Sequence, residues 1–161
     1  MNDWVMWLMA TPVSSGLRNL TWLWPICETL HFIGLAMLIG GAGVFDLRLM
    51  GLIKQVPIRS VKAFMPYAIA GFAINLITGI IFFIVMPTNY VGNGAFYAKM
   101  LFVIVAGMNA MYFETTQGSK ILTMGADETP FTCKVVGALS LFSWFAVMYF
   151  GRMLPYLGTG N

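Results

Sequence analysis

The sequence predicts an all-α integral membrane protein, a four-helix bundle preceded by a short helix that lies on the membrane surface. Two observations support this prediction. Hydrophobic residues make up 59% of the 161-residue chain and charged residues only 9%, whereas a soluble domain carries roughly 25% charged residues. Four long apolar stretches also recur along the chain, and each approaches the ~20 residues needed to cross the bilayer. Because lipid offers no hydrogen-bond partner to a bare backbone, these stretches should be helical.

The predicted spans cover residues 26–45, 65–86, 97–113 and 135–150. Residues 1–21 are too short and too polar to cross. They contain Trp4 and Trp7, followed by the turn residues Thr11 and Pro12. Tryptophan favours the headgroup layer, so residues 1–21 are interpreted as an interfacial helix and turn. No repeat or second domain is evident, and residues 1–161 form one transmembrane domain.

The positive charges predict the orientation of the bundle. Six of the nine Lys and Arg residues fall in the first and third connections, namely Arg48, Lys54, Arg59, Lys62, Lys120 and Lys134. The positive-inside rule puts these connections in the cytoplasm of a bacterial cell, with both termini on the periplasmic side of the inner membrane. A net charge of +3 and no basic run with interleaved aromatic residues exclude nucleic acid as a partner.

Small residues predict that the spans pack closely on one another. Gly71, Asn75 and Gly79 are spaced by four in the second span, and Ala106 and Ala110 in the third. Small residues at this spacing let helix backbones approach, and a buried asparagine can bridge two helices. We expect one compact bundle in the lipid bilayer, forming a homo-oligomer or contacting other membrane subunits.

The strongest chemical signal is Glu28 followed by His31, the one histidine of the chain, within the first span. Ionisable residues inside a membrane usually face the bundle interior or a water-filled cavity. Lys99 begins the third span and Arg152 follows the fourth, at about the same depth. The bundle should therefore gather these four charged or titratable residues near its outer end.

This cluster has three interpretations. In the structural one, Glu28 pairs with Arg152 or Lys99, and His31 bonds a carbonyl group. In the second, His31 ligates a b-type haem beside Gly34, which leaves room for the macrocycle, and the cations meet its propionates. The second axial ligand would be a methionine or the His31 of another subunit.

In the third interpretation, the cluster binds a metal such as copper, for which histidine with methionine or cysteine is a suitable ligand set. Cys27 lies one turn before His31. With Cys133 it makes two cysteines and no CxxC pair, so neither a zinc ribbon nor a covalently attached haem is encoded.

Polar residues near the inner end of the bundle are interpreted as structural. We expect Arg48 to anchor at lipid headgroups and Asp46 to pair elsewhere, with Glu114 as a possible partner; Asn109 is assigned to the same structural class. The sequence contains no nucleophile and base pattern, no phosphate loop and no carboxylate pair placed for hydrolysis. A stand-alone enzyme is therefore not expected.

Several motifs resemble an uncharacterised family of small bacterial four-helix membrane proteins. The resemblance rests on Trp24-Pro25, Glu28 to Gly34, Gly40, Asp46 to Gly51, Lys99 to Leu101, Ala106 to Ala110, Ser143-Trp144 and Gly151-Arg152. It covers nearly the whole chain and implies that Glu28, His31, Asp46, Arg48, Lys99, Asn109 and Arg152 belong to the shared pattern. The Leu-His-x-x-Gly run is also similar, more loosely, to the copper-resistance D membrane family.

Three functional hypotheses follow. The first is a small subunit that binds haem through His31 and serves electron transfer in a larger complex or oligomer. The second is a membrane protein that handles copper through His31, Cys27 and a nearby methionine. The third is a non-catalytic accessory subunit that acts as a scaffold for a membrane enzyme.

Overall fold

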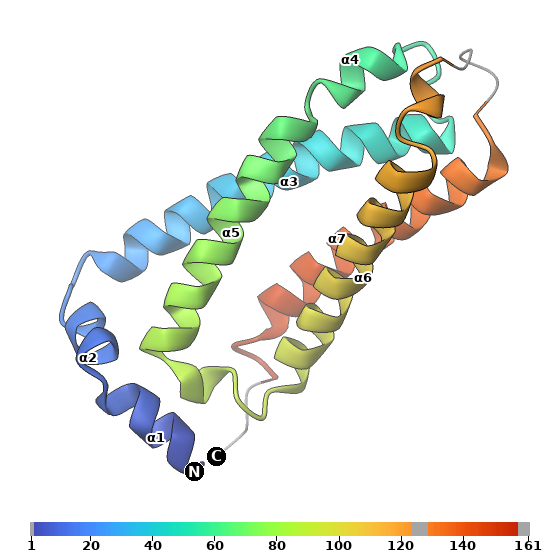
Figure 1. Ribbon diagram of the computed structural model, residues 1–161. Helices are drawn as coiled ribbons and strands as arrows, with labels where there is room; N and C mark the ends of the chain where they lie inside the picture. Colours follow the sequence, from blue (N-terminus) through green and yellow to red (C-terminus); the bar gives the residue numbers. More distant parts are fainter. Residues whose placement is uncertain (1, 124–128, 158–161) are drawn as a thin grey trace.

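The computed structural model describes residues 2–123 and 129–157, which are helical apart from their connections (Figure 1). Four helices are long and apolar enough to cross a membrane when α4 and α5 are counted as one crossing. The elements in chain order are α1 (Asp3–Ala10), α2 (Pro12–Arg18), α3 (Leu23–Met50), α4 (Ile58–Lys62), α5 (Met65–Val85), η1 (Pro87–Asn89), α6 (Gly94–Thr116), η2 (Lys120–Leu122) and α7 (Phe131–Met153). The predicted all-α membrane fold is confirmed.

The first span is longer at its inner end than predicted. Helix α3 runs on to Met50 because Gly51 adopts the left-handed conformation (φ 82°) and closes the helix with two backbone bonds. Gly51 N–H bonds Arg48 O at 3.1 Å, and Leu52 N–H bonds Leu47 O at 3.0 Å. Such a glycine cap satisfies carbonyl groups that a helix end otherwise leaves unpaired. Asp46 and Arg48 therefore lie within α3 rather than in a connection.

The long helices form two antiparallel pairs, α3 with α5 and α6 with α7, joined by contacts between α3 and α7. Figure 1 shows the two pairs close together near the end that bears α4 and farther apart toward the end that bears the termini. The close contacts agree with this picture. A Cβ on Gly137 of α7 would lie 2.8 Å from the backbone oxygen of Asp46, in the inner part of α3.

Glycine lets α3 and α5 approach to backbone contact. A Cβ on Gly34 would lie 2.8 Å from Gly71 O, and a Cβ on Gly71 would lie 2.8 Å from Leu38 N and still closer to Gly34 O. A Cβ on Gly41 would lie 2.9 Å from Phe64 O. By contrast, Gly40 and Gly79 have no neighbour within 4 Å, although Gly79 belongs to the predicted small-residue spacing. The contact line therefore passes through Gly34, Gly41 and Gly71.

Helices α1 and α2 cover the outer end of α5. Ser14 of α2 is fully buried and its hydroxyl donates to Ile84 O at 2.8 Å, while Trp4 of α1 stacks on Phe83 with ring centroids 6.5 Å apart. The segment predicted as one interfacial helix and a turn thus forms two short helices, Asp3–Ala10 and Pro12–Arg18. Trp7 remains 70% exposed, which suits a headgroup-level side chain.

The outer connection between α5 and α6 is held by aromatic rings. Phe83 stacks on Phe96 at 5.8 Å, and Tyr90 lies edge-on to Phe96 at 5.3 Å. Burial in this cluster raises the pKa of the Tyr90 phenol above its ordinary value. The two helix pairs are thus joined here through side chains, and Asn93 caps α6 by accepting from Ala95 N–H at 2.9 Å.

Candidate functional site

His31 lies eight residues into α3, about 12 Å from its outer end at 1.5 Å per residue. Its ring turns toward α5, where Nδ1 lies 2.7 Å from Thr78 Oγ1. The ring of Phe82, one turn further along α5, lies 5.6 Å from the imidazole. His31 is partly exposed, whereas Thr78 is buried. The histidine thus sits on the edge of the helix interface rather than in its centre.

The hydrogen bonds of Thr78 favour a proton on Nδ1 of His31. Thr78 Oγ1 lies 2.8 Å from Ile74 O, a carbonyl that can only accept. With the single hydroxyl hydrogen directed to that carbonyl, the hydroxyl oxygen accepts from His31 Nδ1–H. This assignment leaves Nε2 unprotonated, and Nε2 has no hydrogen-bond partner among the described residues. Its lone pair is available to a ligand.

The backbone around His31 is fixed by Asn75 of α5. With its amide oriented to satisfy both neighbours, Asn75 donates to His31 O at 2.7 Å and accepts from Leu35 N–H at 3.0 Å. Lipid could not supply hydrogen bonds of this kind. The Asn75 amide therefore ties α5 to the turn of α3 that carries the imidazole. His31 is therefore held at its ring and at its backbone by the same helix.

Lys99 of α6 is the charged residue that shares the site. Its charge acts on the imidazole of His31, and its side chain passes over Gly151 of α7, where an added Cβ would lie 3.6 Å from Nζ. The outer halves of three helices, α3, α5 and α6, thus contribute to the surroundings of His31.

Glu28 and Arg152 do not join them. Glu28 is exposed and has no ion-pair or hydrogen-bond partner among the described residues, so the expected pairing with Lys99 or Arg152 is wrong. Arg152 is exposed at the end of α7, with its guanidinium 5.9 Å from the Tyr156 ring. Gly34 also differs from expectation, because α5 fills the space beside it where a macrocycle was expected to fit.

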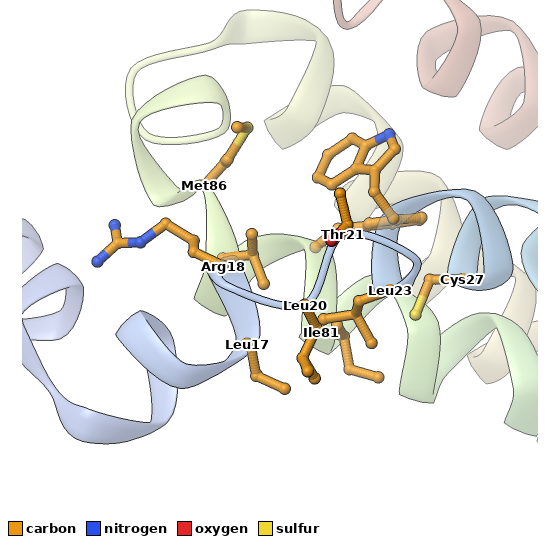
Figure 2. A pocket seen from close by; sticks show the side chains of 11 residues that line it. Leu17, Arg18, Leu20, Thr21, Leu23, Cys27, Ile81 and Met86 are labelled. Atoms are coloured by element: carbon orange, nitrogen blue, oxygen red, sulfur yellow. The ribbon is translucent and has the colours of Figure 1, made fainter.

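A cavity of about 180 Å³ lies between the α2 to α3 connection and the outer end of α5 (Figure 2). Cys27 is buried and lines this cavity, and the guanidinium of Arg18 points away from it to donate to Met9 O. The rings of Trp24 and Phe82, 4.8 Å apart, both line it. Cys27 and His31 therefore belong to neighbouring but different surroundings.

The described residues contain no group of three His, Cys, Asp or Glu side chains placed to hold a metal ion. A copper site built on His31 and Cys27 within one chain would need methionine for its remaining ligands. A haem asks for fewer protein ligands, because the macrocycle already supplies four nitrogen atoms to the iron.

At the inner end, the polar residues bind the fold together. Arg48 is buried at 3% exposure, and its Nε donates to Val56 O at 2.7 Å, so the expected anchoring of Arg48 at lipid headgroups is wrong. Glu114 pairs with Lys62 Nζ at 3.0 Å rather than with Asp46. Asn109 of α6 donates to Val136 O of α7 at 3.0 Å.

Asp46 of α3 is buried on the side of α3 that faces α7. It bonds the hydroxyl of Ser140, and its Oδ2 has no hydrogen-bond partner among the described residues. A buried carboxyl oxygen in this state is an exception to the usual pairing of polar atoms.

Sequence reasoning missed Thr78 and Phe82, and it used Lys62 only to predict the orientation of the bundle. Thr78 and Phe82 lie in a span without charges, where a threonine and a phenylalanine look like ordinary packing residues. The spacing of Asn75, Thr78 and Phe82 at three and four residues is a signal that could have found them, since it places one amide, one hydroxyl and one ring on one face of α5.

Comparison with known proteins gives one match. A family of unknown function (DUF6644) matches residues 23–157. The chain belongs to this family. The match begins at the first residue of α3 and covers all four long helices and the His31 site. No curated protein and no solved structure matches the chain, and the looser similarity to the copper-resistance D family stays a prediction.

Proposed function

We propose that this protein is a small electron-transfer subunit in which His31 Nε2 is an axial ligand of a b-type haem. The observation that carries the proposal is the 2.7 Å contact between His31 Nδ1 and Thr78 Oγ1, whose hydroxyl also lies 2.8 Å from the acceptor Ile74 O. Histidine ligands commonly donate their second nitrogen to an oxygen acceptor, which fixes the tautomer and the ring orientation. Thr78 supplies that acceptor, and Nε2 remains for iron.

A haem would not be enclosed by one copy of this chain. Ligand pockets usually measure roughly 300–1,000 Å³, whereas the cavity beside the site measures about 180 Å³ and is separated from His31 by Phe82. His31 is partly exposed and is the single histidine of the sequence. We therefore propose that two copies meet at this face and that His31 of each provides one axial ligand.

The charges at the outer end suit this arrangement. A haem bound there would supply one-electron chemistry, and its propionates need cations. Lys99 already lies within electrostatic range of the imidazole, and Arg152 stands exposed at the same end of the bundle. From the distribution of Lys and Arg, we propose that this end lies on the periplasmic side of the bacterial inner membrane, together with both termini.

An optical spectrum tests the proposal. The protein is purified from its native membrane in mild detergent, and oxidised and reduced spectra are recorded together with the haem content per chain. We expect a Soret band, sharp bands on reduction, and one haem for every two chains. His31→Ala should abolish the bands. Glu28→Gln, a change at an exposed residue three positions away without a partner among the described residues, should keep them.

A folded but colourless protein from the native membrane would overturn the haem proposal. Metal analysis would then test copper handling, and the identity of co-purifying membrane subunits would test a scaffold role. A haem content of one per chain would retain haem binding but overturn the shared site.

A further inference from the structure

A shallow groove of about 420 Å³ lies between α4 and η2, at the end of the bundle opposite to His31. Its lining residues are Arg59, Lys62, Ala63 and Leu122. Two of these residues carry positive charge and two are apolar. The groove thus combines cations with an apolar floor at the inner end of the membrane-crossing helices.

The charge in this groove is only partly neutralised. Lys62 Nζ donates to both carboxylate oxygens of Glu114, at 3.0 and 3.3 Å, and to Gly118 O at 2.9 Å. All three donor hydrogens of its ammonium group are thus used. Arg59 is exposed and has no ion-pair or hydrogen-bond partner in the described part of the chain. Lys120, which begins η2, is in the same state.

The groove lies at the start of the candidate span Ile58–Val85, a position that suits the level where lipid headgroups meet the hydrocarbon. Helix α4 leads directly into α5, whose first residues are apolar. Phe64 and Tyr67 at this junction are 52% and 61% exposed, as aromatic residues at a membrane boundary commonly are. A molecule whose head contacted Arg59 could extend its chains along Leu122 and Phe64 into the bilayer.

We propose that this groove binds the headgroup phosphate of an anionic phospholipid through Arg59, with Lys120 as a second contact. The planar guanidinium presents paired donors that match phosphate oxygens, and no group in residues 2–123 and 129–157 uses them. Lys62, held by Glu114, positions α4 against the third connection and so shapes the groove. Phosphate is the recognised chemistry, and the exposed rings at the junction favour lipid over a soluble phosphate as its source.

The test measures lipid binding to the intact protein by native mass spectrometry or by fluorescence quenching in mixed vesicles. Phosphatidylglycerol is titrated against a phosphatidylcholine background. One basic residue near a charged membrane surface contributes about 1 kcal/mol, so Arg59→Gln should weaken phosphatidylglycerol binding about fivefold, and Arg59→Gln with Lys120→Gln about 25-fold.

Lys134→Gln is the matched control, because Lys134 is exposed at the same end of the bundle but outside the groove. It should leave the affinity within a factor of two. Equal losses in the Arg59 and Lys134 variants would overturn the site in favour of general surface charge. Competition by millimolar inorganic phosphate, with no requirement for acyl chains, would instead identify a soluble phosphate ligand and overturn the lipid assignment.

Discussion

The polar residues at the two ends of the bundle differ in how fully their hydrogen-bonding atoms are used. At the inner end, Arg48 bonds a backbone carbonyl, Lys62 bonds Glu114, and Asn109 bonds the backbone of α7. At the outer end, His31 bonds Thr78 through one nitrogen and leaves the other without a partner among the described residues. These three inner residues serve the fold, whereas His31 has a ring nitrogen that no hydrogen bond in the described structure uses.

This comparison shows how to interpret ionisable residues in a small membrane protein. All of them are costly in lipid, so their presence alone does not separate structure from function. What separates them is the number of donor and acceptor positions that the fold leaves unused. Asp46 also lies at the inner end, but it leaves an acceptor unused, because its Oδ2 is buried without a partner in the described structure.

The largest effect should come from forcing α3 and α5 apart at the glycine contact that positions His31. In Gly71→Ala, the new Cβ would overlap the backbone of α3 at Gly34 and Leu38. Overpacking of this kind costs about 1–3 kcal/mol, and it should also separate Thr78 from His31. Thermal unfolding in detergent measures the loss. Gly79→Ala on the same helix, where nothing lies within 4 Å, should be neutral; equal losses in the two variants would contradict the contact.

The inner end should depend most on Arg48. Arg48→Met keeps much of the side-chain volume but leaves the carbonyl of Val56 without its donor. An unsatisfied buried group costs about 1–3 kcal/mol, so the variant should unfold at lower temperature while keeping any cofactor bound at His31. Loss of the cofactor with unchanged stability would contradict the assignment of Arg48 to the fold.

Thr78→Val tests the outer end with a smaller change. Valine keeps the shape of threonine and removes the acceptor for Nδ1–H and the donor to Ile74 O. We expect the free energy of unfolding to fall by about 1 kcal/mol. We also expect a shifted reduction potential of the haem proposed to bind at His31. An unchanged reduction potential would contradict a role for Thr78 in tuning His31.

The pair of Lys62 and Glu114 should have the smallest effect. The Glu114 side chain is 64% exposed, and exposed pairs contribute only about 0.2–1 kcal/mol. A double-mutant cycle with Lys62→Met and Glu114→Gln measures the coupling. A coupling well above this range would show that the inner end depends on this ion pair more than on Arg48.

The fold could be predicted from the sequence because lipid leaves few choices. An apolar stretch of sufficient length must be a helix, so the four crossings follow from composition alone. The inner boundary of α3 was missed because Asp46 and Arg48 look like the polar start of a connection. Their burial against α7 and Val56 depends on contacts that only the folded chain makes.

The candidate site could be predicted only in part. His31 was identified as a lone histidine in an apolar helix, but the partner of its ring lies 47 positions away on another helix. The orientation of Glu28 was missed for a geometric reason. At about 100° per residue, Glu28 lies about 60° to one side of His31 and Cys27 about 40° to the other. Helix α5 covers the side of Cys27, so Glu28 faces outward.

The measurement that tests the central claim most directly is the nitrogen-15 NMR spectrum of protein labelled only at histidine and free of any cofactor. One histidine gives one pair of ring nitrogen signals, so no assignment problem arises. At a pH where the imidazole is neutral, we predict a protonated Nδ1 and a pyridine-type Nε2, with Thr78→Val altering the Nδ1 signal. A protonated Nε2 with a bare Nδ1 would contradict the account, because His31 would then offer no lone pair for a ligand.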